Sequence, residues 1–325
     1  METTLRVNRE QLVRHRLAVN NLTTRLPVGS IAAGARFGLQ DTAPRDGLLG
    51  LHARVEGCRP DAWQHPDLIQ TYSPRRAVYL LPRDDFGIFT LGQLPIDAER
   101  RRQLERDADA VCRELDGRER RGSGLVPHRE VCASGRIALR WTTSALYVRE
   151  VDRPAIDPDT ARRELCRRHL QGFGPTTAAC FSWWSGLSRA DAAEVWQQLA
   201  ADLIPVEIDG GRGWILADDE ERLRAAPEPS GARLLVPSDL RLFGQDRTGR
   251  FVGPGQRPLC DLHDRFHPGG VMWDGRVVGS WGRRGGRVDI RVPQSLGGTA
   301  RQAIEEEALG MPIPGAMMSA VINRM

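Results

Sequence analysis

The segment Phe37-Gly-Leu-Gln-Asp-Thr-Ala-Pro-Arg-Asp-Gly-Leu-Leu-Gly-Leu-His-Ala-Arg-Val55 says more about the fold than any other part of the chain. It places Gln40 at the joint between two short predicted helices, the second over residues 44–55, and Asp41 and Thr42 follow directly. Thr42 has the right position to cap the second helix, and Asp41 would lie near the positive end of its dipole. From these two residues alone, a helix cap is the simpler explanation and a catalytic pair the alternative.

The same segment resembles the signature of the winged-helix DNA glycosylases of the AlkZ and YcaQ family. In that signature a glutamine, a hydrophobic residue and a second polar residue position the hydrolytic water. Gln40 matches the glutamine, whereas Asp41 replaces the hydrophobic residue and Thr42 replaces the usual Gln or Asp. The resemblance implies that Gln40 holds a water beside the anomeric carbon and that Thr42 helps to orient it. Asp41 would assist, because a carboxylate can take up a proton and an amide cannot.

The clearest structural unit is predicted over residues 157–217. Asp157 before Pro158 is typical of a helix start, and Ser188 is expected to cap a third helix after a turn and a second one. Two strand-like segments, residues 203–208 and 214–217, then flank a glycine-rich turn. Three helices followed by a hairpin is the plan of a winged helix.

The rest of the chain is organised around this plan. The first hundred residues repeat it loosely, with a helix at 30–38 and wing strands expected over residues 69–81 and after Asp85. Residues 96–152 predict a degenerate copy with a long helix and a strand over 137–151. Beyond Pro229 the pattern changes to strands at 233–237, 270–274, 276–281 and 287–292, and Thr299 is expected to cap a late helix.

The predicted fold class is therefore α+β, with three tandem winged-helix units followed by a small C-terminal β-rich domain. The expected boundaries are 1–95, 96–155, 156–228 and 229–325. This order also resembles the AlkZ and YcaQ family, and residues 269–281 look like its C-terminal strand pair with an Asp-Gly turn. The resemblance implies that the units surround a concave DNA channel.

The composition excludes some chemistry. The chain carries a net charge of +4, and all 46 of its basic residues are arginine because the sequence contains no lysine. A lysine Schiff base and a P-loop lysine are thus impossible, so a glycosylase of this kind would act through water. The six scattered cysteines indicate reduced thiols, and no apolar run reaches the length of a membrane span. We expect a cytoplasmic protein without a membrane segment or a cofactor.

Arginines are the candidate DNA contacts. The segment from Arg276 to Arg291 holds five arginines against the single acid Asp289, so it is expected to follow phosphates or enter the minor groove. A hairpin kept soluble by its charge is an equally simple explanation. The arginines of residues 99–121 are matched by acids and predict a solvated helix. The predicted DNA-binding residues are Arg36, Arg45, Arg54, Arg75, Arg76, His267, Arg276, Arg283, Arg284 and Arg287.

Two other sequence patterns indicate structural residues and not a functional site. Cys260, His263 and His267 have half of a zinc-site spacing without the second cysteine, and we predict no metal there. Trp183, Trp184 and Trp196 occur at helical spacing and are expected in the core.

The function implied by the resemblance is hydrolysis of the N-glycosidic bond of alkylated purines in duplex DNA, including bulky or crosslinked adducts. Such activity would serve DNA repair or self-resistance to a genotoxin, and one chain with three winged units could wrap a duplex as a monomer. The alternative is a non-catalytic winged-helix DNA-binding protein, either a regulator or a shield for lesions. A third hypothesis is a winged-helix scaffold that contacts another protein. This hypothesis predicts no salt-dependent DNA affinity.

Overall fold

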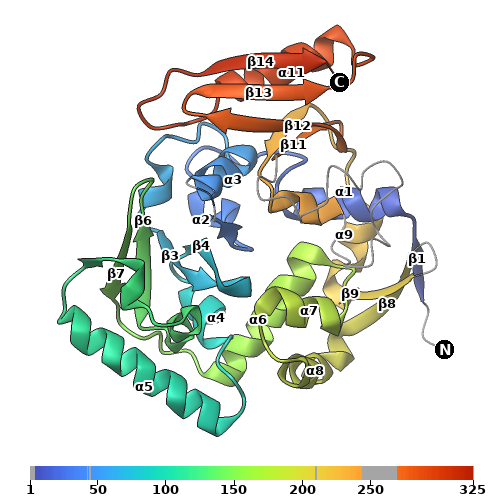
Figure 1. Ribbon diagram of the computed structural model, residues 1–325. Coiled ribbons are helices and arrows are strands. Elements are labelled where there is room, and N and C mark those ends of the chain that lie inside the picture. Colours follow the sequence, from blue (N-terminus) through green and yellow to red (C-terminus); the bar gives the residue numbers. More distant parts are fainter. Residues whose placement is uncertain (1–3, 42, 44, 209–210, 244–268, 325) are drawn as a thin grey trace.

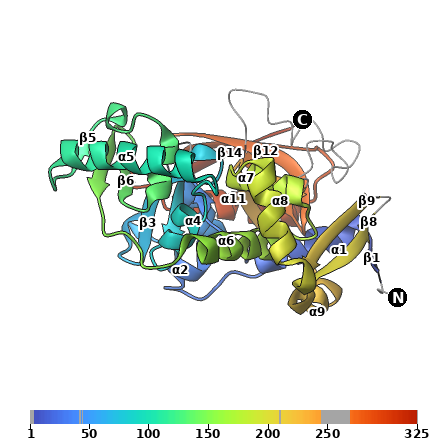
Figure 2. The same ribbon diagram turned by 90° about the horizontal axis from the view of Figure 1, so that it is seen from below.

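The computed structural model describes residues 4–41, 43, 45–208, 211–243 and 269–324. These residues form an α+β protein with a three-, a five- and a six-stranded sheet. Figure 1 shows the five-stranded C-terminal sheet lying across one end of the molecule, above α3 (Asp46–Arg54). In both ribbon views α5 (Ala98–Leu115) lies at the opposite edge from the strand pair β8 and β9 (Leu203–Ile208 and Gly211–Leu216; Figure 2).

The helix-helix-helix-hairpin unit is present where the sequence predicts it. Its elements are α6 (Pro158–Phe173), α7 (Ala178–Ser185), α8 (Arg189–Gln198) and the hairpin β8–β9. The expected caps form, because Asp157 Oδ2 accepts from the Thr160 amide at 2.9 Å and Ser188 Oγ from the Asp191 amide at 3.0 Å. The turn residues 209 and 210 lie outside the described residues. The N-terminal strand β1 (Leu5–Val7) adds to β8 in parallel, a pairing that the sequence did not predict.

The first two predicted units share one sheet. Its order is β2-β4-β3-β6-β7-β5, and β3 meets β6 at Gln70 and Leu139. A short two-stranded wing leaves an unpaired edge, and the neighbouring hairpin covers it. The expected boundary at residue 95 therefore falls between elements that contribute to the same sheet. The strands are β2 (Leu39–Gln40), β3 (Leu68–Ser73), β4 (Ala77–Pro82), β5 (Arg120–Arg121), β6 (Ile137–Trp141) and β7 (Leu146–Glu150).

Several predicted elements differ in the structure. The segment after Asp85 is a helix, α4 (Phe86–Leu91), rather than a wing strand, because Phe86 and Phe89 bury on one helical face. The single strand expected over residues 137–151 is a hairpin of two strands. The helix expected over residues 30–38 is reduced to α2 (Ile31–Gly34).

The C-terminal sheet has its strands in sequence order, with the last one parallel to its neighbour. The predicted strands are confirmed, whereas the final strand was not predicted. Gly297 rather than Thr299 caps the late helix, and no side chain supplies the cap bond. The elements are β10 (Ala232–Leu235), β11 (Gly269–Trp273), β12 (Arg276–Arg284), β13 (Arg287–Val292), α11 (Gly298–Leu309) and β14 (Ser319–Arg324).

The C-terminal sheet is joined to the N-terminal part through a shared core. Leu49 of α3 packs in the cluster formed by β10 to β13 and α11. Helix α1 (Arg9–Val19) contributes Leu17 to a second cluster with Leu240 and Phe243. The remaining elements are α9 (Glu220–Arg224) and the 3₁₀ turns Ala62–Gln64, Pro74–Arg76, Ser123–Leu125, Arg129–Ser134, Ala200–Asp202, Ala217–Asp219 and Asp239–Phe243.

Helix α5 confirms the prediction of a charged surface helix up to Leu115, whereas Arg120 and Arg121, which were expected in the same helix, form β5. Arg102 and Arg106 both pair with Glu99 on its exposed face. Other acids of this helix pair with residues outside it, for example Asp107 with His128. Over the described parts of the chain, no helix is both long and apolar enough to cross a membrane.

Candidate functional site

Gln40 lies at the end of β2, beside Tyr79 of β4. Gly38 precedes this strand with φ +76°, and a Cβ there would lie 2.9 Å from Tyr79 and 3.0 Å from Leu81. Only glycine accepts this left-handed turn at such close approach. The turn therefore places Gln40 on the edge of the six-stranded sheet, and the glutamine is held by a strand instead of a joint between two helices.

Gln40 lines a small cavity with a volume of about 30 Å³. That volume is enough for one water molecule. The cavity lies where three parts of the chain meet: the first unit, helices α6 and α7, and the segment 238–242. Its other lining residues are Asn20, Phe37, Gly38, Arg54, Tyr79, Phe173, Trp184, Ser238, Asp239, Arg241 and Leu242.

A buried arginine holds the side chain of Gln40. Arg241 Nη1 donates to Gln40 Oε1 at 3.0 Å. Burial lowers the pKa of Arg241 to about 10, so the guanidinium remains charged at neutral pH. Its central carbon lies 5.6 Å from the ring centre of Trp183, and that of Arg75 lies 4.4 Å from the same ring. Trp183 is partly buried, whereas Trp184 is a core residue.

Asp41 is buried and fully engaged, with 2% of its surface exposed. Its Oδ1 accepts from the Gly47 amide at 2.9 Å, and its Oδ2 accepts from Gln70 Nε2 at 2.8 Å. Desolvation raises its pKa to about 6, against the effect of these donors and of the charge on Arg45. Asp41 thus binds the first turn of α3 near the positive end of the helix, as the sequence predicted, but the helix begins at Asp46 with Arg45 as its N-cap, so the prediction of Thr42 as the cap was wrong. Asp41 is not among the residues that line the cavity, and Thr42 lies outside the described residues.

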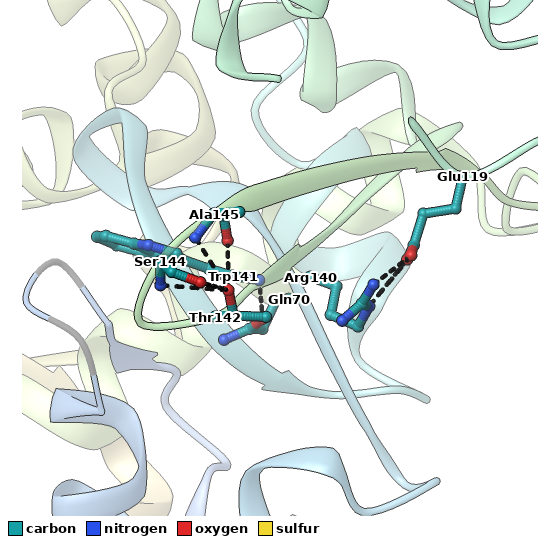
Figure 3. Close-up of polar contacts among 7 residues, drawn as sticks. All are labelled: Gln70, Glu119, Arg140, Trp141, Thr142, Ser144 and Ala145. Atoms are coloured by element: carbon teal, nitrogen blue, oxygen red, sulfur yellow. Dashed lines mark hydrogen bonds and ion pairs between the residues drawn. The ribbon is translucent and has the colours of Figure 1, made fainter. Parts of the chain in front are cut away.

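Gln70 connects Asp41 to the neighbouring hairpin, as Figure 3 shows for the hairpin side. The Trp141 amide donates to Gln70 Oε1 at 2.7 Å, and Arg45 Nη1 donates to the Trp141 carbonyl at 3.2 Å. At the hairpin tip Thr142 Oγ1 accepts from the Ala145 amide at 2.9 Å (Figure 3). Arg45 is therefore bonded to β6 directly, and Asp41 is linked to the same strand through Gln70 of β3.

Asp46 is the acidic residue at the start of α3 that the sequence analysis did not single out. Burial, together with the negative charge of Asp41, raises its pKa to about 7, whereas a backbone hydrogen bond at Ala43 and the charge of Arg283 oppose the shift. Arg283 lies on β12, so this interaction places the basic hairpin of the C-terminal sheet beside the start of α3.

The predicted DNA-binding arginines of the first unit occupy different environments. Arg54 is 3% exposed and forms two hydrogen bonds with Asp239, at 2.8 and 2.9 Å. Arg45 is also buried, with its guanidinium 3.7 Å from the ring centre of Trp63. These contacts engage Arg54 and Arg45 within the protein, so neither forms part of the DNA-binding surface proposed below.

The other arginines are more accessible. Arg36 is exposed and donates to Gln171 at 3.1 Å. Arg76 is exposed and paired with Glu130 at 2.7 Å, while Arg75 is half-buried against Trp183.

The basic hairpin is largely solvent-accessible. Arg276, Arg284 and Arg287 are exposed, and Arg283 is half-buried with Nη1 donating to the Gly285 carbonyl at 2.7 Å. Arg287 also pairs with Asp289 at 2.9 Å.

Metal binding finds no support in the part of the chain that the structure describes. Those residues contain no group of three or more His, Cys, Asp or Glu side chains arranged to hold an ion. Cys260, His263 and His267 lie outside the described residues, so the expected absence of a metal there and the DNA-binding role of His267 remain predictions.

Residues 125–311 match the family model described as DNA glycosylase AlkZ-like. This is more than half of the chain, so the protein belongs to the AlkZ-like DNA glycosylase family and the resemblance seen in the sequence is confirmed. Gln40 precedes the matched region, and its role remains a prediction.

A curated relative and a solved structure, both from Streptomyces sahachiroi, are similar to this chain. The chain is 27% identical over 129 residues to an interstrand DNA cross-link repair glycosylase, covering 38% of this chain and 35% of that protein. The match thus spans about a third of the length of this curated relative. The structure of the DNA glycosylase AlkZ superimposes with a TM-score of 0.74 at 17% identity, over 98% of this chain and 100% of the other. That similarity shows a shared fold over nearly the whole chain.

Four residues at or beside the site were not predicted from the sequence: Tyr79, Asp239, Arg241 and Asp46. Each belongs to an ordinary polar or amphipathic pattern in its own segment, and nothing in its spacing relates it to Gln40. A residue that approaches the site only through tertiary contacts leaves no periodic signal in the sequence.

Proposed function

We propose that this protein is a monofunctional DNA glycosylase that hydrolyses the N-glycosidic bond of alkylated purines in duplex DNA. The observation that carries the proposal is the position of Gln40, which lines a cavity of one-water size with its amide held by Arg241. Membership of a DNA glycosylase family supports the reaction class.

Hydrolysis of this glycosidic bond requires the protein mainly to position the attacking water. A purine alkylated at N7 or N3 is cationic, so the base leaves as a neutral molecule and the glycosidic bond is already activated. A glutamine amide can orient the attacking water, and correct placement alone supplies much of the rate enhancement. Because the sequence contains no lysine, a lysine side chain is not available for a Schiff-base lyase step.

The proposed DNA-binding surface contains the arginines of the β12–β13 hairpin together with Arg36, Arg75 and Arg76. The charge of Arg283 lowers the pKa of Asp46, which supports a location of that hairpin near the start of α3, the helix that follows the Gln40 segment. Phosphates along this surface would be bound by guanidinium groups, which can donate two parallel hydrogen bonds. The protein would act on DNA as a monomer, in repair or in resistance to a genotoxin.

The preferred lesion is a bulky or crosslinked adduct. This part of the proposal is supported by the name of the relative, an interstrand DNA cross-link repair glycosylase, with which the chain shares sequence similarity.

The test is base release from duplex DNA that carries N7-alkylguanine, from a methyl group to a bulky adduct. We expect release by the parent protein and loss of release in Gln40→Ala. Gln103→Ala is a matched control, because this glutamine lies on the exposed face of α5 and pairs with Asp107. Equal release by the parent and Gln40→Ala would contradict the assignment of Gln40.

The second candidate is a non-catalytic DNA-binding protein. It is favoured by one observation: Asp41, the carboxylate next to Gln40, is occupied by its hydrogen bond to the first turn of α3. Salt-dependent binding to the duplex without base release from any adduct would support this candidate over the glycosylase.

A further inference from the structure

The hydrogen bond between Arg241 and Gln40 determines which end of the glutamine amide faces the guanidinium. A guanidinium carries donors only, so the amide oxygen must point toward it. The reverse orientation would place an NH₂ group against an N–H group and leave a buried cation without its acceptor. The 3.0 Å hydrogen bond from Arg241 therefore allows only one orientation of the Gln40 amide, with its oxygen toward the guanidinium.

Arg241 is itself held from two sides. Its guanidinium lies over the indole of Trp183 on α7, at 5.6 Å from the ring centre. Two residues earlier in the same 3₁₀ turn, Asp239 forms the buried pair with Arg54 of α3. The neighbouring Leu240 and Leu242 are buried in the core. The position of Arg241 is therefore determined by α3, α7 and the core together, and it is not free to follow Gln40.

We propose that Arg241 is a positioning residue for the glycosidic reaction, which holds the Gln40 amide in one orientation at the cavity. The inference rests on the proposed function for its kinetic consequence, but the orientation can be measured without any turnover.

The charge of Arg241 does not itself explain a contribution to the reaction. The alkylated base is cationic and the sugar gains positive character in the transition state, so a nearby guanidinium opposes both by simple electrostatics. Arg75 adds a second positive charge beside Trp183, and Asp239 is paired with Arg54. The guanidinium also hydrogen-bonds the buried Tyr79, which lines the same cavity. We assign the benefit of Arg241 to its contact with Gln40, which the double variant below tests.

The kinetic test compares Arg241→Met, Arg241→Lys and the parent under single-turnover and steady-state conditions. Misplacement of a positioned group costs up to about 100-fold in rate, so we expect kcat in Arg241→Met to fall by about 10- to 100-fold with little change in KM. Arg241→Lys keeps a charged donor without the planar fork and should recover part of the rate. In a Gln40→Ala background Arg241→Met should cause no further loss.

The test that needs no turnover is NMR of protein labelled with ¹⁵N at glutamine, with the Gln40 side-chain NH₂ signals assigned from Gln40→Ala. In Arg241→Met we expect these signals to shift or broaden, while those of Gln103 stay in place. Arg162→Met is the matched control for loss of a buried arginine, because Arg162 donates to the Leu94 carbonyl at 2.9 Å and is not among the residues that line the Gln40 cavity.

The outcomes separate the two hypotheses. If the parent releases no base but the Gln40 signals respond to Arg241→Met, the proposed function fails and the orienting role of Arg241 stands. Unchanged Gln40 signals, or an equal loss of rate from Arg241→Met with and without Gln40, would overturn the inference. If Arg241→Met does not fold, Arg241→Lys replaces it, with a smaller fall in kcat and a smaller change in the Gln40 signals expected because a charged donor is retained; parent-like kcat and Gln40 signals in Arg241→Lys would then overturn the inference.

Discussion

Arg54 and Asp239 form a buried ion pair with two parallel hydrogen bonds, Nη1 to Oδ2 at 2.9 Å and Nη2 to Oδ1 at 2.8 Å. The pair joins the last residue of α3 to the 3₁₀ turn that carries Arg241. One member of the pair came from the predicted DNA-binding set, and the structure places it between the N-terminal helices and the C-terminal sheet. Arg54 is therefore an interior residue that anchors the turn carrying Arg241.

Removal of one partner should destabilise the fold strongly. Asp239→Asn leaves the Arg54 guanidinium buried without its countercharge, which costs about 3–5 kcal/mol of unfolding free energy. Urea denaturation measures the effect. Asp61→Asn, which breaks the exposed pair with Arg59, is the control and should change little. Similar losses in the two variants would show that the buried pair is not a structural element.

Gly38→Ala should damage the site as well as the fold. The φ of +76° and the contacts of a new Cβ with Tyr79 and Leu81 make any side chain strained there. We expect a loss of about 1–3 kcal/mol in unfolding free energy and a larger fall in base release than that loss explains. Gly298→Ala at the start of α11 meets no atom within 4 Å and serves as the control. Normal base release by a destabilised Gly38→Ala protein would mean that the turn does not position Gln40.

Asp46 should make stability depend on pH near neutrality. Burial raises its folded-state pKa from 3.8 to about 7, so the folded protein binds this proton more tightly than the unfolded chain. Its stabilising contribution is complete below pH 3.8 and is lost as the pH rises toward 7. Asp46→Asn should remove this decline, as urea titrations at about pH 5 and about pH 8 would reveal.

Asp41 titrates in an overlapping window, with a pKa raised to about 6. The parent and Asp46→Asn must therefore be compared at each pH. Parallel stability profiles for the two proteins would rule out a raised pKa at Asp46.

Arg284→Gln should weaken DNA binding in a salt-dependent manner. Removal of a single contact to a phosphate reduces the steepness of log K against log salt by about 0.9. Fluorescence anisotropy with an undamaged duplex at several salt concentrations measures this slope. Arg102→Gln on α5 is the control, because Arg102 pairs with Glu99 on the surface of that helix. An unchanged slope for Arg284→Gln would remove the hairpin tip from the proposed DNA-binding surface.

The sequence predicted local structure well where neighbouring residues determine it. The caps at Asp157 and Ser188 and the strands of the C-terminal sheet are confirmed. The prediction failed after Asp85, where a short apolar run fitted a strand or a helix and burial selected the helix. Thr299 was wrong as a cap because the helix begins earlier, directly after Gly297.

The sequence by itself determined the family and the helix-helix-helix-hairpin unit. The family followed from short motifs, and the unit from caps and turns that depend on residues only a few positions apart. Tertiary structure alone decided the surroundings of Gln40. The contact with Arg241 joins residues 201 positions apart, and the pair of Arg54 with Asp239 joins residues 185 positions apart. Such contacts depend on how whole elements pack, and each partner taken alone is an ordinary polar residue in its own segment.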